Sequence, residues 1–278
     1  MISIPVAVHN DFFKWQLDLF WHNHKLTYKN IAKHKTLAII IKRNNPQEQK
    51  KESLEWDIDI PHSLCESFFD ILGTGSPGDN HVPLNIQLGL QQIIDRFNDD
   101  EILEIIDCDM FHIRHHPFID IEDDQIFVDD IYEPWHLKSL SSNRKIIDIY
   151  FENGGRFYNG GFVPIIARAK TIRKILPQWI AVHVDIGKRN YSGEINWWAG
   201  MFALQVACEK NKVRMIAKDW CYIPGINQIT DKHYIAHYSC SYKFNKKTFP
   251  VIDVKQFEQN IFFDRLRSWP ILCNTIEK

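Results

Sequence analysis

Short apolar runs alternate along the chain with segments whose apolar residues recur every three or four positions. Residues 2–9 form an apolar run that is typical of a strand buried on both faces. Residues 11–24 place phenylalanine, leucine and tryptophan at helical spacing, and Asp11 can cap the start of that helix. The same two patterns predict strands at 36–43, 56–61 and 101–107 and a helix at 83–97.

The second half of the chain continues this alternation. It predicts a helix at 169–180, the longest helix at 195–211, and short strands at 213–220 and 232–240. Strands that alternate with helices predict an α/β fold with a mixed, mostly parallel central sheet flanked by helices. Because no internal repeat, low-complexity tract or clear linker occurs, residues 1–278 are expected to form one domain.

Composition restricts the class of protein. The 278 residues are 45% hydrophobic and 13% aromatic, which suits a large core and disfavours disorder. The formal net charge of -2 disfavours a protein that coats nucleic acid, although not a local basic groove. Six scattered cysteines without a CxxC pair indicate free thiols in a reducing compartment. With neither a signal-peptide pattern nor an apolar run of membrane length, we expect a cytoplasmic protein.

Two acids stand one residue apart where the apolar run 101–107 ends, Asp107 and Asp109 in IIDCDM. Ligands of open α/β sheets bind beyond the carboxyl ends of the strands. Two carboxylates at this spacing, on a turn that leaves a strand, can both reach one Mg²⁺ or Mn²⁺, which offsets charge on a diphosphate. The alternative interpretation is a pair of solvated acids in a loop.

Two further features have both a functional and a structural interpretation. His237 follows an apolar strand and can offer an imidazole to the same cation, although a histidine at a strand end is more often structural. In the stretch YNGGF, Gly160 and Gly161 allow the backbone beside Asn159 to approach a ligand closely, or they form a tight turn.

Two other patterns do not indicate a site. GTGSPG at 73–78 matches GxGxxG, but it follows a helix-like segment and contains Pro77, so a loop is expected. His112, His115 and His116 follow the two acids, but no other Cys/His cluster completes a zinc site, so structural or surface roles are expected.

These pieces, taken in order, resemble the GT-A glycosyltransferases. More narrowly, they are similar to the plant and algal hydroxyproline O-arabinosyltransferases and the related peptidyl serine galactosyltransferases. The resemblance rests on PIIARAKTIRKILPQWIAVHVDIGK at 164–188, INWWAGMFALQVACEKNKVRMIAKDWCYIPG at 195–225 and KHYIAHYSCSYKF at 232–244. Shorter matches lie upstream, in KWQLDLFWHNHK, VPLN and DCDM.

The resemblance implies a GT-A-type, Rossmann-like domain with a UDP-sugar donor and with Mn²⁺ or Mg²⁺ held by Asp107, Asp109 and His237. It also implies transfer of arabinose or a hexose to a hydroxyl group, with retention of anomeric configuration. Together with the position of the first strand's end, it gives a set of expected donor contacts. These are His9, Asn10, Asp11, Asn85, Asp107, Asn159, Gly160, Gly161 and Lys243.

One position departs from the family's pattern. The family carries an acid three residues after the tryptophan of its long helix, and Gly200 stands there after Trp197. Glu194 and Asp185 lie near in sequence and are the candidates for a catalytic carboxylate in its place. Trp197 and Trp198 are candidates to pack against the acceptor, although tryptophans in helices are more often core residues.

The acceptor and the class of activity stay open. The family's plant members are membrane-anchored, and the lack of such a span here puts a peptide acceptor in doubt. A chain rich in Lys, Asn and Ile suits a bacterium or a phage-infected host, in which a hydroxymethylated pyrimidine of phage DNA could accept the sugar. A peptide, glycan or lipid-linked sugar is the competing acceptor. A non-catalytic nucleotide-sugar-binding module and a metal-dependent phosphohydrolase are the alternatives from other classes, and the sequence does not define the oligomer.

Overall fold

The computed structural model describes residues 1–29, 31, 33–42, 58–66, 82–116, 120–129, 149–150, 162–189, 193–222 and 230–237 of the chain. The helices are α1 (Asp11–Thr27), α3 (Val82–Ile93), α6 (Ala169–Lys188) and α7 (Gly193–Lys210), with a 3-10 turn η2 (Ile94–Arg96) after α3. The strands are β1 (Ile2–Val8), β2 (Lys35–Thr36), β3 (Ala38–Ile41), β4 (His62–Cys65), β5 (Ile102–Asp107), β6 (Met110–His112), β7 (Gln125–Asp129), β8 (Phe162–Arg168), β9 (Arg214–Lys218), β10 (Cys221–Tyr222) and β11 (Ile235–His237).

A mixed central sheet organises the fold. Its strand order is β4-β3-β1-β5-β8-β7-β9, with β2 paired to β1. Strand β8 runs antiparallel to β5 and β7, and the other neighbouring pairs are parallel. A smaller sheet has the order β10-β11-β6, in which β11 is antiparallel to β6. The predicted α/β class with a mixed, mostly parallel sheet is therefore confirmed.

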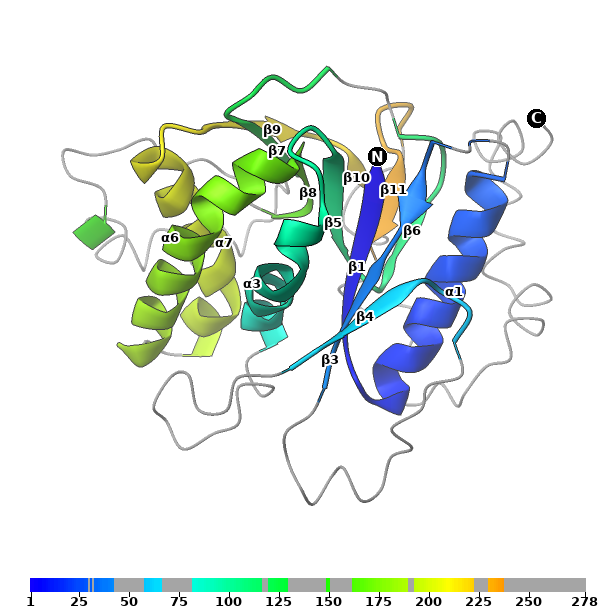
Figure 1. Cartoon of the computed structure of the whole chain (residues 1–278), viewed down its shortest axis with the longest axis horizontal. Coiled ribbons are helices and arrows are strands. Elements are labelled where there is room, and N and C mark those ends of the chain that lie inside the picture. The colour runs from blue at the N-terminus through cyan, green and yellow to red at the C-terminus, as the bar shows by residue number, and fades with distance from the viewer. Residues whose placement is uncertain are drawn as a thin grey trace.

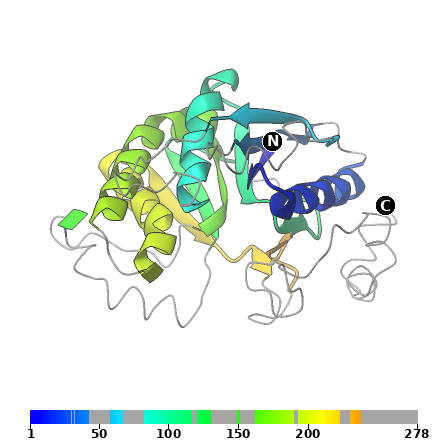
Figure 2. The same cartoon turned by 90° about the horizontal axis from the view of Figure 1, so that it is seen from below.

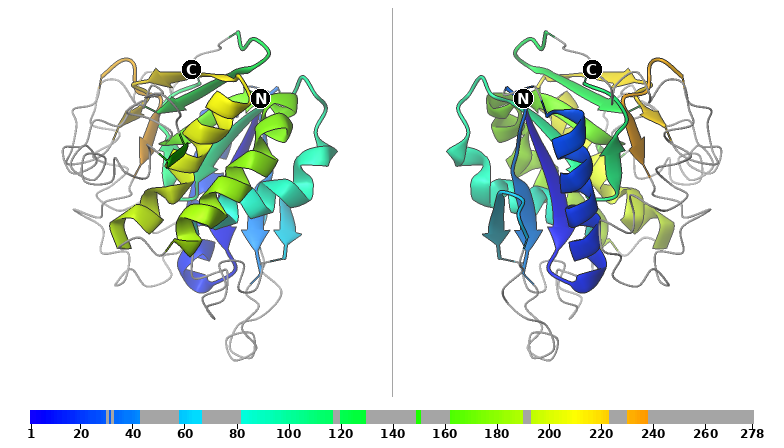
Figure 3. Two further views of the ribbon diagram at one scale, coloured as in Figure 1. Left: turned by 90° about the vertical axis from the view of Figure 1, so that its left-hand side faces the viewer. Right: turned by 90° about the vertical axis from the view of Figure 1, so that its right-hand side faces the viewer.

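Helices cover both faces of the central sheet (Figure 1). Helices α3, α6 and α7 lie together on one face, whereas α1 lies on the other, as the view from below shows (Figure 2). The opposite side views show α6 and α7 in front in one panel and α1 beside β1 in the other (Figure 3). The small sheet lies on the α1 side, where α1 packs against β6. None of the helices in the described ranges has the length and apolar character of a membrane span.

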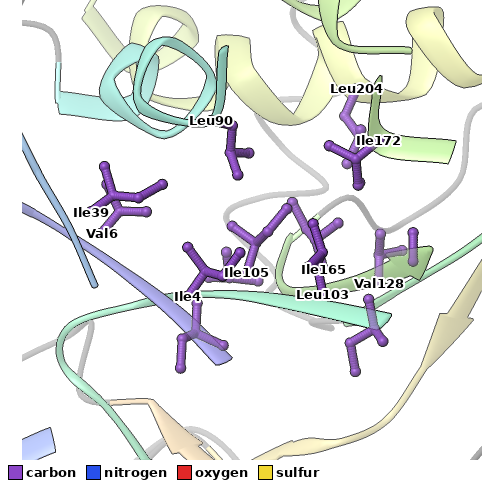
Figure 4. Packing of buried hydrophobic residues seen from close by; sticks show 14 of the residues in the cluster. Ile4, Val6, Ile39, Leu90, Leu103, Ile105, Val128, Ile165, Ile172 and Leu204 are labelled. Atoms are coloured by element: carbon purple, nitrogen blue, oxygen red, sulfur yellow. The ribbon is translucent and has the colours of Figure 1, made fainter. Parts of the chain in front are cut away.

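The main core lies between the sheet and the three-helix layer (Figure 4). Ile4, Leu103 and Ile105 of the strands face Leu90 of α3 and Ile172 of α6 there, and all five side chains are fully buried. Burial of one such side chain contributes about 1.5–3 kcal/mol. The apolar runs that predicted strands are therefore the residues that hold the helices on the sheet.

Several local predictions were wrong. The strand predicted at 56–61 begins only at His62 in the described residues, because Ala38 N–H donates to the carbonyl of Pro61 at 2.8 Å but Pro61 has no N–H to continue the pairing. The run 36–43 is divided between β2 and β3. Helix α6 has 20 residues and α7 has 18, so α7 is not the longest.

The cap of α1 also differs from the prediction. Asn10, not Asp11, is the N-cap residue, with φ −159° and ψ 162°. This extended backbone directs the Asn10 side-chain oxygen toward the N–H of Phe13, which donates to it at 2.9 Å. Asp11 is the first residue of the helix itself.

The connections place several element ends at one edge of the sheet. β1, β5, β7 and β9 are mutually aligned, so their carboxyl ends share that edge. Helix α6 begins beside the amino end of β5, since Ala169 N–H donates to Glu101 O at 2.8 Å, and so it ends at the carboxyl edge. Helices α3 and α7 precede β5 and β9, which begin at the amino edge of the sheet. These two helices therefore end at the amino edge and begin at the carboxyl edge.

The close approach of α3 to β3 predicts a cost for any side chain at Gly89. A Cβ atom there would lie 2.5 Å from Cγ2 of Ile39 and 3.0 Å from Cδ1 of Ile41. We expect Gly89→Ala to lower the free energy of unfolding by about 1–3 kcal/mol, although alanine is the better helix former. Urea unfolding measures this loss. Gly89→Ala should cost less stability in a protein that already carries Ile39→Ala than in the wild type. A Gly89→Ala variant as stable as the wild type would contradict the contact.

Candidate metal and donor site

Three potential metal ligands converge at the carboxyl edge of β5. Asp107 is the last residue of β5, Asp109 lies in the turn after it, and His237 is the last residue of β11. His237 Nε2 is 3.6 Å from Asp107 Oδ2 and 3.4 Å from Asp109 Oδ1. One donor atom of each residue lies within 4.8 Å of the other two. The predicted grouping of these three side chains is therefore present in the structure.

The site is closed on the protein side and open on the other. The side chain of Asp107 is 39% exposed, whereas those of Asp109 and His237 are 14% and 7% exposed. Two carboxylates and a neutral imidazole form a donor set that suits Mn²⁺, and Mg²⁺ also accepts the carboxylate oxygens. The residues present thus fit a divalent cation, and the exposure of Asp107 would let a second ligand reach it.

Local structure explains why both acids face the same way. The turn at Cys108 and Asp109 reverses the chain between β5 and β6, and Asp107 N–H points to the Met110 sulfur at 3.4 Å. The intervening Cys108 turns inward, and its thiol contacts Gln16 Oε1 at 3.4 Å. Successive residues therefore point to opposite sides, so Asp107 and Asp109 both point to the side opposite Cys108.

Asp129 is a buried acid of this edge that sequence reasoning missed. It ends β7, is 1% exposed, and accepts hydrogen bonds from the N–H groups of Trp220 and Cys221, each at 3.0 Å. Burial raises the pKa of Asp129 to about 7, and the nearby Asp219 adds to this effect, while the two N–H groups and His237 oppose it. The signal was available, since an acid at the end of an apolar run had already marked Asp107.

The donor candidates at the end of β1 have structural contacts. His9 is buried, and its N–H donates to the carbonyl of Ile41 at 2.8 Å. The side chain of Asn10 caps α1. The side chain of Asp11 lies outside the described residues. These contacts explain how the chain turns from β1 into α1 at the carboxyl edge.

Asn85 is the donor candidate with unused hydrogen-bonding capacity. It lies in the first turns of α3, at the same edge, and is 1% exposed. Both side-chain amide atoms are buried and have no hydrogen-bond partner within the described part of the chain. Since buried amides normally have partners, Asn85 is suited to receive a polar group from outside those residues.

Of the two candidate catalytic carboxylates, only the side chain of Asp185 is described. It lies in the last turn of α6 and accepts hydrogen bonds from Tyr150 Oη and from Arg189 Nε, the latter at 3.0 Å. Burial opposes its charge, but these hydrogen bonds and the charge of Arg189 hold the pKa of Asp185 below its usual value. Asp185 is therefore a charged, paired carboxylate and not a free base.

The remaining candidates are placed only in part. Glu194, Trp197 and Trp198 belong to the first turns of α7, at the carboxyl edge, but their side chains lie outside the described residues. The other four candidates lie outside those residues altogether, namely Asn159, Gly160, Gly161 and Lys243.

Gly200 has a packing role in this chain. A Cβ atom at this position would lie 3.2 Å from Gln87 Nε2 and 3.3 Å from His183 Cε1, and Trp179 Nε1 donates to the Gly200 carbonyl at 2.7 Å. Position 200 thus faces α3 and α6. A carboxylate introduced there would enter this helix interface, so the glycine reflects close packing of the helices.

Of the comparisons with known proteins, the comparison with solved structures found matches. No family model matches this chain, and no curated protein does. A crystal structure of the galactosyltransferase LgtC in complex with donor and acceptor sugar analogues has a TM-score of 0.48 and 8% identity, over 93% of this chain and 94% of that chain. A structure of an active-site variant of LgtC has a TM-score of 0.54 and 8% identity, over the same shares.

The second similarity extends over nearly the whole chain and defines the class of fold. The protein has the α/β fold of the GT-A type, as expected from the sequence. At this identity the similarity concerns the fold alone. The narrower resemblance to the hydroxyproline O-arabinosyltransferases and peptidyl serine galactosyltransferases stays a prediction.

Replacement of Asp129 should show how much it stabilises the start of β10. Asp129→Ala leaves the buried N–H groups of Trp220 and Cys221 without their acceptor, so we expect unfolding free energy to fall by about 1–3 kcal/mol. Asp129→Asn keeps an oxygen at the same place and should lose less. Chemical denaturation of metal-free protein measures both, and an equal loss in the two variants would contradict this role.

Proposed function

We propose that the protein is a metal-dependent glycosyltransferase that moves a sugar from a UDP-sugar to a hydroxyl acceptor. The observation that carries this proposal is the convergence of Asp107, Asp109 and His237 at the carboxyl edge of β5 in a fold of the GT-A type. Ligands of open α/β sheets bind at this edge. A nucleotide diphosphate is an anionic ligand that a divalent cation held there would attract.

The donor set indicates how the chain would assist the reaction. Asp107, Asp109 and His237 would hold Mn²⁺ or Mg²⁺, which supplies positive charge opposite the departing diphosphate. His237 must be neutral to act as a ligand, so a bound cation would compete with a proton at its Nε2. Asn85, at the start of α3, would donate to and accept from hydroxyls of the donor sugar.

The catalytic carboxylate is proposed from position. Glu194 lies in the first turn of α7, which begins at the carboxyl edge. Asp185, in contrast, already accepts hydrogen bonds from Tyr150 and Arg189. A glycosyl transfer passes through a positively charged, oxocarbenium-like state that a nearby carboxylate stabilises. We therefore assign this role to Glu194, with Asp185 orienting the end of α6, and with retention of anomeric configuration as the proposed outcome.

The sugar is proposed to be arabinose or a hexose, and the acceptor a hydroxyl, with hydroxymethylated pyrimidine DNA as one class. A DNA acceptor would need a local basic groove. The adjacent basic residues Arg173 and Lys174 do not support one, because Arg173 pairs with Asp95 at 3.1 Å and Lys174 with Asp124 at 2.7 Å. Asp95 and Asp124 also lie at the amino edge of the sheet, away from the candidate metal ligands. A peptide, glycan or lipid-linked sugar is the competing acceptor class.

Donor binding should depend on the metal and on Asp109. Thermal unfolding in the presence of a panel of UDP-sugars should show a raised Tm for one donor only when Mn²⁺ is added, since both would bind the folded state together. Asp109→Ala should abolish this shift and leave the Tm of the free protein nearly unchanged. The matched control is Glu209→Ala, an exposed acid in the last turn of α7, which should retain the full shift.

Turnover distinguishes a transferase from the alternatives. With the donor identified in this way, UDP release should rise at least about tenfold when the correct hydroxyl acceptor is added, because the acceptor is the second substrate. DNA containing hydroxymethylcytosine, a hydroxyproline peptide and a lipid-linked glycan are the acceptors to compare. Release at the full rate without any acceptor would indicate a hydrolase, and donor binding with no release would indicate a binding module.

A further inference from the structure

A cluster of polar side chains is buried beneath the central sheet, away from its carboxyl edge. Glu104 lies at its centre, in the middle of β5, and is fully buried. Ser3 lies directly opposite Glu104 on β1, so both side chains point to the same face of the sheet. This face carries α1 and the small sheet. The side chains of Leu103 and Ile105 lie on the other face, toward the three-helix layer (Figure 4). The Glu104 cluster comprises Ser3, His34, Glu104, His112 and Tyr234.

Donors from separate chain segments meet at the Glu104 carboxylate. The Ser3 hydroxyl donates to Oε2, and the Tyr234 hydroxyl donates to Oε1 at 2.9 Å. His112 Nε2 lies 3.1 Å from Oε2 and 3.3 Å from Oε1. His34 Nε2 lies 2.7 Å from the Ser3 oxygen. Both carboxylate oxygens therefore have partners, which is the condition under which a buried carboxylate is tolerated.

The charge of this carboxylate is supported by its surroundings. Burial opposes ionisation, but the hydrogen bond and charge of His112, together with the nearby His116 and His34, hold the pKa of Glu104 well below its usual range. A charged acceptor forms stronger hydrogen bonds than a neutral one. The contacts from His112 and Tyr234 are thus made to a charged acceptor.

Those segments also carry two of the three candidate metal ligands. Strand β6 begins directly after Asp109 and ends at His112, and β11 begins directly after Tyr234 and ends at His237. The two strands pair antiparallel, with His237 opposite Met110 and Ile235 opposite His112. The metal ligands therefore lie at one end of the β6–β11 pair. Glu104 holds the other end. That end is three residues away along each strand, or about 10 Å.

Asp107 belongs to a different element from the other two ligands. It lies on β5, three residues beyond Glu104, whereas Asp109 and His237 lie at the end of the β6–β11 pair. Within the described residues, Asn23 of α1 also holds this pair, since it accepts from His112 N–H at 2.8 Å and donates to His112 O at 3.0 Å. At the near end of the pair Met110 contacts Asp107 N–H, and at the far end Glu104 joins His112 and Tyr234 to the strand that carries Asp107.

We propose that Glu104 is a positioning residue for the candidate metal site. By holding His112 and Tyr234, it fixes the β6–β11 pair relative to β5, and so fixes Asp109 and His237 relative to Asp107. This inference rests on the proposed function, because it takes these three residues to be metal ligands. Groups that orient metal ligands change metal affinity by about 10–100-fold when removed.

Mn²⁺ affinity in the presence of UDP tests this role without reference to turnover. Tyr234→Phe removes one hydrogen bond and keeps the ring, and we expect it to weaken Mn²⁺ binding about tenfold, at the lower end of such effects. Glu104→Ala should weaken it more, and Glu104→Gln less than Glu104→Ala, because the amide oxygen can still accept from Tyr234 and His112. Electron paramagnetic resonance of free Mn²⁺ measures the dissociation constant.

The matched control is a core variant on the other face of the sheet. Ile172→Ala removes fully buried apolar atoms from α6 and should lower stability, as Glu104→Ala does, but leave Mn²⁺ affinity unchanged. An equal loss of affinity in Ile172→Ala would show a general effect of instability and overturn the proposal. If Glu104→Ala does not fold, Tyr234→Phe still decides.

The outcomes separate this inference from the proposed function. A wild-type protein that binds no Mn²⁺ with UDP would overturn the proposed function itself. Wild-type binding with an unchanged affinity in Tyr234→Phe would overturn the positioning role alone. One further explanation is that the Glu104 cluster itself binds a metal ion. Metal analysis of the purified protein tests this. One equivalent of zinc that is lost in His34→Gln would make the cluster a metal site and overturn its role as a hydrogen-bonded support.

Discussion

The pairing of β6 with β11 is the interaction on which the candidate site depends. Met110 and His237 lie far apart in the sequence, and their opposition in this short antiparallel pair brings the imidazole to the two carboxylates. Neither strand belongs to the central sheet, so their position is not set by its ladder of hydrogen bonds. It must come from contacts made on the α1 side. The side chains of Glu104 and Asn23 supply such contacts at His112, where β6 ends, and Asp129 accepts from the N–H group of Trp220, just before β10, the neighbour of β11.

The sequence predicted those parts of the fold that local patterns determine. Buried strands such as β1 and β5 are mostly apolar, and the helices repeat apolar residues at helical spacing, so both patterns are visible without a partner. The end of β5 was equally visible, which is why Asp107 and Asp109 were identified directly. His237 required the resemblance to a family, because a single histidine after a strand has no local signal for metal binding. The structure places it beside both acids.

What the sequence did not predict depends on contacts between distant segments. Asp129 ends an apolar run as Asp107 does, but its hydrogen-bond partners, the N–H groups of Trp220 and Cys221, are brought to it only by the fold. Gly200 suggested a missing carboxylate, whereas the distances to Gln87 and His183 show a tight helix crossing. The start of β4 was placed too early because a proline without an N–H delays the pairing with β3. Each error concerns a partner that the local pattern does not contain.

Glu104 illustrates how a buried charge can serve position more than stability. In the run EILEIID it is the one acid inside the strand, and an apolar residue of similar size would avoid the cost of burying a carboxylate. An apolar side chain would pack against the same neighbours, but it would not distinguish one placement of the β6–β11 pair from another a fraction of an ångström away. Directional hydrogen bonds to His112 and Tyr234 do distinguish them. A candidate metal site divided between two sheets would need that distinction, because ligand distances must be held within a few tenths of an ångström.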